Sequence, residues 1–200
     1  IMQYNISPET LVEKRHPSAT VNGLLSQKVE VPKEFCLCAN GAMYRKDIHG
    51  FLPEMMKKIY DERVQSKKLM ILAKKEYEKT PTKELEKSIS KYNNIQMARK
   101  IQLNSAYGAI GNQYFRYYNL INAEAITLSG QVSIRWIEHE MNKYLNKILK
   151  TEKQDYVIAS DTDSIYLNLG PLVEVIYKGR EKTNESVVSF LNKILSLIHI

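Results

Sequence analysis

Two lysine-rich stretches on either side of Thr80-Pro81-Thr82 constrain the fold of this chain more than any other feature. Apolar residues recur at helical spacing from about Pro53 to Lys79, and a second helical pattern runs from about Lys83 to Tyr107. Proline interrupts a helix interior but suits the first turn of the next helix. Because a helix of about 26 residues is about 39 Å long, the two stretches predict a long antiparallel helical arm.

The excess positive charge of the chain lies in this arm. The 200 residues include 29 Lys and Arg against 22 Asp and Glu, which gives a net charge of +7. Between Lys57 and Lys100 there are 13 basic and 6 acidic residues, an excess that equals the net charge of the whole chain. Such a concentration favours a polyanionic partner, although a pair of charged, solvated helices gives the same pattern.

The rest of the chain mixes helical and extended patterns, so the predicted fold class is α+β. Asn5–Thr10 carries turn and helix-cap signals, with Ser7 a candidate N-cap and Pro8 suited to a first helical position. We then expect, in chain order, strands at Phe35–Cys38 and Met43–Tyr44 around an Asn40-Gly41 turn, extended chain at Tyr114–Tyr118, a helix from about Ala123 to Leu149, a lysine-bearing loop, and a last amphipathic segment from about Ser186. No apolar run approaches membrane-spanning length and no signal peptide is recognisable, so we expect a soluble intracellular protein without a membrane partner.

Cys36 and Cys38 are the only cysteines. A zinc site needs about four ligands, and no second pair is present in the sequence. We therefore interpret them as structural thiols in a reducing compartment.

The segment Tyr156–Leu167 carries two carboxylates, Asp161 and Asp163, between two apolar runs. The apolar runs favour strands and Ser-Asp-Thr-Asp-Ser favours a turn, which predicts a β-hairpin with both aspartates at its tip. Two like charges this close are costly unless a cation lies between them, and hard oxygen ligands suit Mg²⁺. From these residues alone, a metal site and an exposed polar turn remain open.

A second candidate site lies near the end of the second predicted helix. Lys100, Asn104 and Tyr107 are spaced i, i+4 and i+7, so they share one helix face, and Gly108 follows directly. This row offers a phosphate contact, an amide and an aromatic surface to a nucleotide, and the glycine leaves room for close approach. Packing by the tyrosine, a solvated lysine and a helix C-cap at Gly108 are the alternatives.

Arg63 and Lys67 lie one turn apart on the first predicted helix. If they face Lys100 across the arm, the three cations form a cluster suited to a triphosphate. A solvated Arg and Lys on a lysine-rich helix is the alternative.

These residues carry a family resemblance. Lys100–Gly108 resembles the Lys-x3-Asn-Ser-x-Tyr-Gly motif of family B DNA polymerases, and Asp161-Thr162-Asp163-Ser164 resembles the Asp-Thr-Asp-Ser metal-binding motif of the same family. The two motifs occur in the family's order. Asn5–Thr10, Asn40–Tyr44 and Phe115–Tyr118 are similar to the replicative polymerases of T-even-like bacteriophages. The likeness covers almost the whole chain and is weakest near Thr20–Lys33 and in the last dozen residues.

The resemblance implies a partial polymerase palm of antiparallel strands and packed helices, with the helical arm inserted as the fingers. Residues 1–52 would be the first palm segment, 53–111 the fingers and 112–200 the second palm segment with the metal-binding hairpin. The activity implied is template-directed DNA synthesis, by two-metal phosphoryl transfer to a primer 3′ end. The implied catalytic residues are Asp161, Asp163 and Lys100, the implied nucleotide-binding residues are Arg63, Lys67, Lys100, Asn104, Tyr107 and Gly108, and the implied ligands of two Mg²⁺ ions are Asp161 and Asp163, with Asp163 the more direct.

The resemblance also implies what lies outside the chain. Another essential aspartate belongs to a family motif that ends at Ile1, so we expect a fragment that is inactive alone. The implied partners are primer-template DNA and deoxynucleotide triphosphates, with a sliding clamp and other replisome proteins binding through other regions. The implied location is the cytoplasm of an infected bacterial host.

Two other functions remain possible from the residues. An Asp-x-Asp metal-dependent glycosyltransferase would use Asp161 and Asp163 but leaves the Lys100–Gly108 row unexplained. A non-catalytic basic helical module would bind nucleic acid in a salt-dependent way, without need of Mg²⁺.

Overall fold

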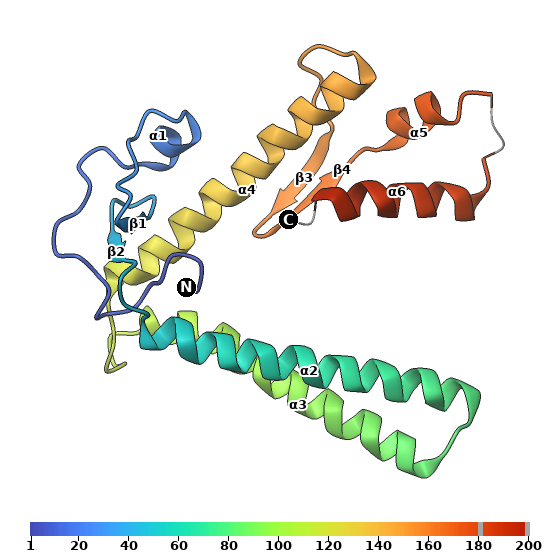
Figure 1. Cartoon of the computed structure of the whole chain (residues 1–200), viewed down its shortest axis with the longest axis horizontal. Helices are drawn as coiled ribbons and strands as arrows, with labels where there is room; N and C mark the ends of the chain where they lie inside the picture. Colours follow the sequence, from blue (N-terminus) through green and yellow to red (C-terminus); the bar gives the residue numbers. More distant parts are fainter. Residues whose placement is uncertain (180–181, 199–200) are drawn as a thin grey trace. The chain divides into compact units, whose positions relative to one another are not determined.

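The computed structural model describes residues 1–179 and 182–198 and has an α+β fold (Figure 1). Its elements are α1 (Val21–Leu25), β1 (Phe35–Leu37), β2 (Met43–Arg45), α2 (Phe51–Lys79), α3 (Lys83–Ile110), α4 (Leu120–Leu149), β3 (Val157–Asp161), β4 (Ser164–Leu167), α5 (Gly170–Ile176) and α6 (Asn184–Ile198). The chain forms two compact units, Ile1–Val132 and Ser133–Ile200, and the boundary between them falls inside α4. No helix in the described ranges is both long and apolar enough to span a bilayer.

The predicted helical arm is confirmed by α2 and α3, which pack against each other along the first unit (Figure 1). The side chain of Thr82 caps α3 by accepting a hydrogen bond from the backbone N–H of Leu85. Both helices are longer than predicted, since α2 begins two residues earlier and α3 continues to Ile110. The C-cap of α3 is Gly111, so Gly108 remains helical.

The turn signals at Asn5–Thr10 are confirmed, because residues 8–10 form a turn, but no helix begins at Ser7 and Pro8. Ser7 does cap a helix, but that helix is α2. Its Oγ accepts a hydrogen bond from the backbone N–H of Leu52 at 3.4 Å, and Glu9 Oε1 accepts one from the N–H of Phe51 at 2.6 Å. Distant residues therefore satisfy backbone donors that the start of an α-helix leaves without partners.

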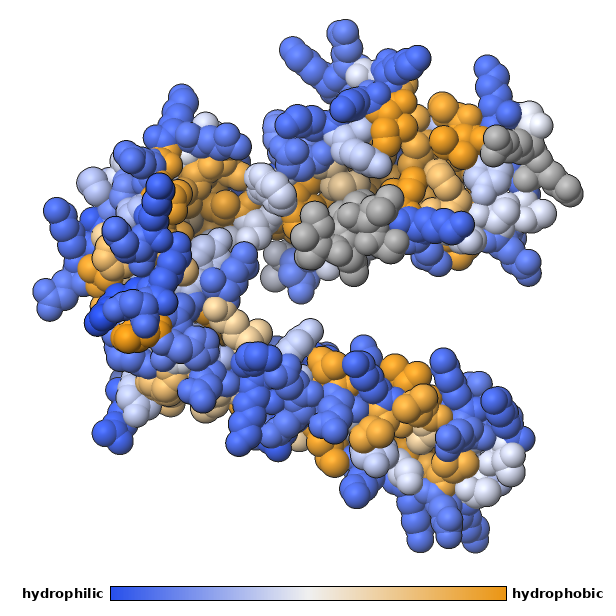
Figure 2. All heavy atoms as spheres, viewed as in Figure 1, coloured by the Kyte–Doolittle hydropathy of each residue, from blue (hydrophilic) through white to orange (hydrophobic). Residues whose placement is uncertain are grey.

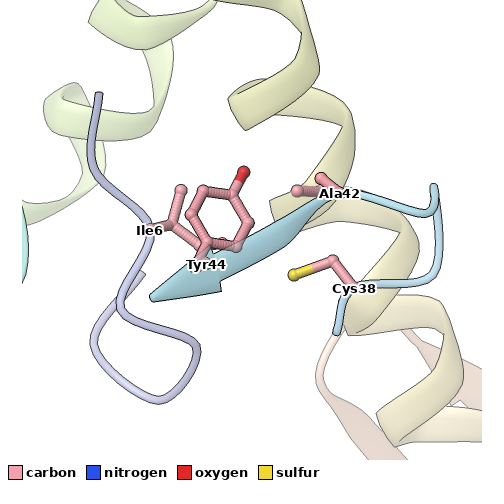
Figure 3. Close-up of a cluster of buried hydrophobic side chains, with 5 residues drawn as sticks. Ile6, Cys38, Ala42 and Tyr44 are labelled. Atoms are coloured by element: carbon pink, nitrogen blue, oxygen red, sulfur yellow. The ribbon is translucent and has the colours of Figure 1, made fainter. Parts of the chain in front are cut away.

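The predicted strands pair as an antiparallel hairpin, with Leu37 opposite Met43 and a turn at Asn40-Gly41 in which Gly41 has a φ of +82°. Beside it lies a core cluster of Ile6, Cys38, Ala42, Tyr44 and Ala125 (Figure 3). The Tyr44 hydroxyl donates to Asn122 Oδ1 on α4 at 2.8 Å. Burial raises the pKa of Tyr44, so this hydroxyl stays a donor.

Extended chain at Tyr114–Tyr118 was also expected, and this prediction is wrong. The segment folds as two consecutive turns, in which the N–H of Phe115 donates to the carbonyl of Asn112 and the N–H of Tyr118 to that of Phe115. The Tyr117 ring lies 5.0 Å from the Phe51 ring, centroid to centroid. The Phe115 ring packs edge-on against Tyr117 in turn, whereas Tyr114 is 88% exposed. The turns therefore bring Tyr117 to the base of α2 and leave Tyr114 in solvent.

The second unit has its own core, made of Met141, Leu145, Tyr156 and Leu172. Asn142 on α4 accepts a hydrogen bond from the N–H of Tyr156 at 2.8 Å and donates to Asp155 at 2.8 Å. The backbone N–H of Val157 and the Asn142 side chain lower the pKa of Asp155. These contacts fix the entry to β3. Helix α5 was not predicted, and α6 begins two residues before the predicted segment.

Candidate functional site

Lys100, Asn104 and Tyr107 lie on α3 and are all exposed, as their spacing predicted. Tyr107 is 43% exposed, which excludes a core-packing role for it within this chain. Lys100 makes no ion pair with any residue in the described ranges. The row therefore presents an uncompensated cation, an amide and an aromatic face to whatever binds there. In Figure 2, hydrophilic residues and a group of hydrophobic ones share the visible face of the arm.

Gly108 has no structural need to be glycine. It lies inside α3, and a Cβ built on it would meet nothing within 4 Å in the described chain. Glycine in a helix interior is less favourable than alanine by about 0.5–1 kcal/mol. The C-cap interpretation of Gly108 is wrong, since Gly111 occupies that position. The missing side chain thus leaves open space next to Tyr107.

Arg63 and Lys67 lie on α2 at a level set by an ion pair between the two helices. Glu62 Oε2 on α2 is 2.7 Å from Arg99 Nε on α3. Because the helices run antiparallel, Arg63 and Lys100 lie one residue to either side of this ion pair, within about 3 Å of each other along the arm. Lys67 is exposed one turn further along. The predicted cation cluster of the first unit is consistent with this alignment.

The predicted hairpin at Asp161 and Asp163 is confirmed. Strands β3 and β4 pair antiparallel, with Asp161 opposite Ser164, and Thr162 and Asp163 form the turn. Thr162 has a φ of +51°, a left-handed conformation that is rare for a β-branched residue. Its hydroxyl donates to Asp161 Oδ1 at 2.9 Å, and the Ser164 hydroxyl donates to Asp163 Oδ1 at 3.1 Å. A hydroxyl therefore orients each carboxylate.

The tip of this hairpin offers ligands of the kind that Mg²⁺ prefers. Asp161 and Asp163 are exposed, and each has one carboxylate oxygen held by a neighbouring hydroxyl while the other is available. No group of three or more His, Cys, Asp or Glu that could hold a metal occurs within residues 1–179 and 182–198. The two carboxylates fit as a partial ligand set. They belong to the second compact unit, and the three cations belong to the first.

Three features of the site escaped the sequence reading. The capping of α2 by Ser7 and Glu9 joins residues too far apart for local signals to reveal. The Glu62–Arg99 ion pair could have been found by aligning the two predicted helices in antiparallel register. No sequence signal marks the left-handed Thr162.

The two cysteines are free thiols, as predicted. Burial raises the pKa of Cys38 to about 11, which keeps this thiol protonated near neutral pH and unsuited to metal binding. The structure therefore gives Cys36 and Cys38 no part in the candidate site.

Comparison with known proteins identifies the family. The family model of DNA polymerase family B matches residues 1–192. The chain is 33% identical to the DNA-directed DNA polymerase of Enterobacteria phage T4 and 30% identical to that of Escherichia phage RB69, in each case over 96% of this chain and 26% of the relative. It is also 30% identical to a DNA polymerase of Pyrococcus glycovorans, over 84% of this chain and 18% of the relative. The chain thus spans about a quarter of the length of the phage polymerases it matches, and it belongs to DNA polymerase family B.

Proposed function

We propose that this chain is the palm-and-fingers part of a polymerase that adds deoxynucleotides to a primer 3′ end on a DNA template. The observation that carries the proposal is the exposed Lys100, Asn104 and Tyr107 row beside open space at Gly108, in a chain of family B. Residues 1–52 and 112–200 would form the palm, and residues 53–111 the fingers. Family membership gives no support to the glycosyltransferase alternative.

The cations of the arm would bind the incoming triphosphate. Lys100, Arg63 and Lys67 would neutralise negative charge on its phosphates, and positive groups placed where charge develops lower the barrier to phosphoryl transfer. Arg63 can offer two parallel N–H donors to one phosphate, whereas each lysine acts as a compact point charge. Movement of the arm toward the palm would then bring the bound triphosphate to the primer end.

Asn104, Tyr107 and Gly108 would line the newly formed base pair. The Tyr107 ring offers a flat apolar surface to a base, and Asn104 offers hydrogen-bond groups at its edge. Without a Cβ at Gly108, a base pair could approach the helix backbone closely. Base pairing would choose the nucleotide, and these residues would test the shape of the pair.

Asp161 and Asp163 would hold the metal, with Asp163 the more direct ligand. When bound, two Mg²⁺ ions would stabilise the attacking 3′ oxygen and the leaving pyrophosphate. The hydroxyls of Thr162 and Ser164 would keep the carboxylates oriented. Because the residues of this chain offer only two carboxylates at that hairpin, we expect the 200 residues not to extend primers alone. A sliding clamp and other replisome proteins would bind elsewhere, in the cytoplasm of an infected host if a phage encodes the protein.

Asp163→Ala in an intact polymerase that includes these 200 residues tests the proposal. Primer extension should fall below detection while primer-template binding, measured by gel shift, persists. Lys100→Ala should slow single-nucleotide incorporation by about 10²- to 10³-fold, as for loss of one transition-state donor. Glu152→Gln and Lys87→Ala change exposed charges outside the site and serve as matched controls.

Two results would contradict the proposal. Near-normal extension by Asp163→Ala would remove the metal-ligand assignment. Salt-dependent DNA binding without any Mg²⁺-dependent extension, in the unaltered intact protein, would instead support a binding module.

A further inference from the structure

An ion pair between Glu62 and Arg99 joins α2 to α3. Glu62 Oε2 lies 2.7 Å from Arg99 Nε in an ion pair that is not aligned as a hydrogen bond, and both side chains are about one-third exposed, at 37% and 34%. Arg99 is also held on its own helix, because its guanidinium donates to Gln102 Oε1 at 2.7 Å. The Arg99 guanidinium is therefore held by a residue of its own helix as well as by Glu62 on α2.

Large apolar residues close the seam between the two helices near its base, where Leu52 and Ile110 share a core cluster with Ala123. Further along the arm, the buried residues are Ser66 and Ala73 on α2 and Gln96 on α3, which are small or polar. Small side chains interlock weakly, so packing along this part of the seam does little to align the two helices. A polar or ionic pair at one position is a known way to specify a single register.

The proposed nucleotide contacts depend on that register. Arg63 follows Glu62 and Lys100 follows Arg99, and each step along a helix turns the side chain by about 100°. Both cations therefore face a different flank of the seam from the ion pair itself. A slip of one helical turn would move Lys100 by about 5.4 Å relative to Arg63 and Lys67. That displacement exceeds the reach of a hydrogen bond to a shared phosphate.

A second observation, on Arg63, indicates that packing between α2 and α3 determines where the cations lie. Its Nε atom is buried and has no hydrogen-bond partner in the described part of the chain, although the residue as a whole is only partly buried. The stem of Arg63 is thus packed, while the neighbouring ion pair sets the level of α3 against it. The guanidinium can reach a ligand only from the position that this packing allows.

We propose that Glu62 and Arg99 are positioning residues, which set the register of the arm so that Arg63, Lys67 and Lys100 converge on one triphosphate. The proposal rests on the proposed function of those cations. A partly exposed ion pair contributes little to stability, so its effect should appear in nucleotide binding and not in unfolding. The Lys57–Asp61 ion pair gives a matched control, because it lies within α2 and cannot affect register.

The test compares Glu62→Gln, Arg99→Gln, the charge swap Glu62→Arg with Arg99→Glu, and the control Asp61→Asn. All are made in the intact polymerase and assayed by single-turnover incorporation of one deoxynucleotide. Each single variant should raise the apparent Kd for the nucleotide by about 2- to 5-fold, the most that an ion pair worth about 1 kcal/mol can contribute through the register. The rate at saturating nucleotide should change less. The charge swap should recover most of the lost affinity, and Asp61→Asn should match the unaltered enzyme.

A double-mutant cycle separates this role from a general structural one. In the Lys100→Ala background, Glu62→Gln should raise the apparent Kd by much less than it does alone, because its effect passes through Lys100. Full additivity, no recovery in the charge swap, or singles equal to Asp61→Asn would each overturn the proposal. An unaffected Lys100→Ala enzyme would instead contradict the proposed function of the cation cluster.

Discussion

The carboxylate of Glu9 accepts a hydrogen bond from the backbone N–H of Phe51, 42 positions later in the sequence and the first residue of α2. Ser7 supports this contact by donating to the other Glu9 oxygen at 2.6 Å and accepting from the N–H of Leu52. Asn5 completes the set by accepting from the N–H of Gly50 at 2.9 Å. A Cβ at Gly50 would lie 2.5 Å from Ser7 Cβ, so glycine is required there.

Loss of these caps should weaken the base of the arm. We expect Ser7→Ala and Glu9→Ala each to lower the free energy of unfolding by about 1 kcal/mol, the usual effect of removing a helix N-cap. Chemical denaturation of the 200-residue chain measures this. Glu13→Ala, an exposed carboxylate with no described contact to α2, is the control and should have no such effect. Equal stabilities of all three variants would contradict the cap.

The contribution of Glu9 should depend on pH. Desolvation acts to raise its pKa, but hydrogen bonds from Ser7 and from the Phe51 N–H outweigh this and hold the pKa below its ordinary value of 4.5. A carboxylate with a lowered folded pKa stabilises the fold above its unfolded pKa, and this stability is lost as the pH falls through the folded value. The difference in unfolding free energy between wild type and Glu9→Gln should therefore be constant near neutrality and narrow below about pH 4.5. A difference that widens on acidification would be inconsistent with this assignment.

Gly108→Ala should separate stability from activity. Since nothing lies within 4 Å of the added Cβ, the helix should gain about 0.5–1 kcal/mol in unfolding free energy. Incorporation by the intact polymerase should nevertheless fall by about 10-fold or more, the effect of one methyl group placed in a fitted pocket. Gly130→Ala, also helical and open, should stabilise without slowing incorporation. Unchanged incorporation by Gly108→Ala would remove Gly108 from the nucleotide site.

Thr162 should show a similar separation. The left-handed conformation costs an L-residue with a Cβ about 1–2 kcal/mol, so Thr162→Gly should unfold at equal or higher temperature. The same variant loses the hydroxyl that orients Asp161, and its primer extension should fall. Thr162→Ser keeps the hydroxyl and should retain activity. The expectation fails if extension by Thr162→Gly equals that of Thr162→Ser.

The elements that follow from a repeating pattern of apolar residues could be predicted from the sequence. The α2–α3 arm follows from two helical patterns and the break at Thr80-Pro81-Thr82, and the β3–β4 hairpin from apolar runs around a turn. No helix begins at Ser7, because the hydroxyl caps α2 instead. The sequence shows that a serine side chain can cap a helix, but tertiary contacts decide which helix it caps.

Part of the candidate site could likewise be predicted from the sequence, and part could not. Helical spacing was enough to place Lys100, Asn104 and Tyr107 on one exposed face, and the antiparallel arm was enough to bring Arg63 near the same level. The tight turn that presents Asp161 and Asp163 was expected, but the left-handed Thr162 within it was not. Threonine rarely adopts a left-handed conformation, so its backbone preference gave no sign of the conformation that the hairpin imposes.

The capped base of α2 has a mechanical consequence. A helix of 29 residues is about 44 Å long, and its base is held where residues 5–9 hydrogen-bond to residues 50–52. A tilt of about 10° at that base would displace the far end of the helix by about 8 Å, given the rise of 1.5 Å per residue. The three hydrogen bonds at the base, of 2.6 to 3.4 Å, therefore lie where a small change of angle has its largest effect at the tip of the arm.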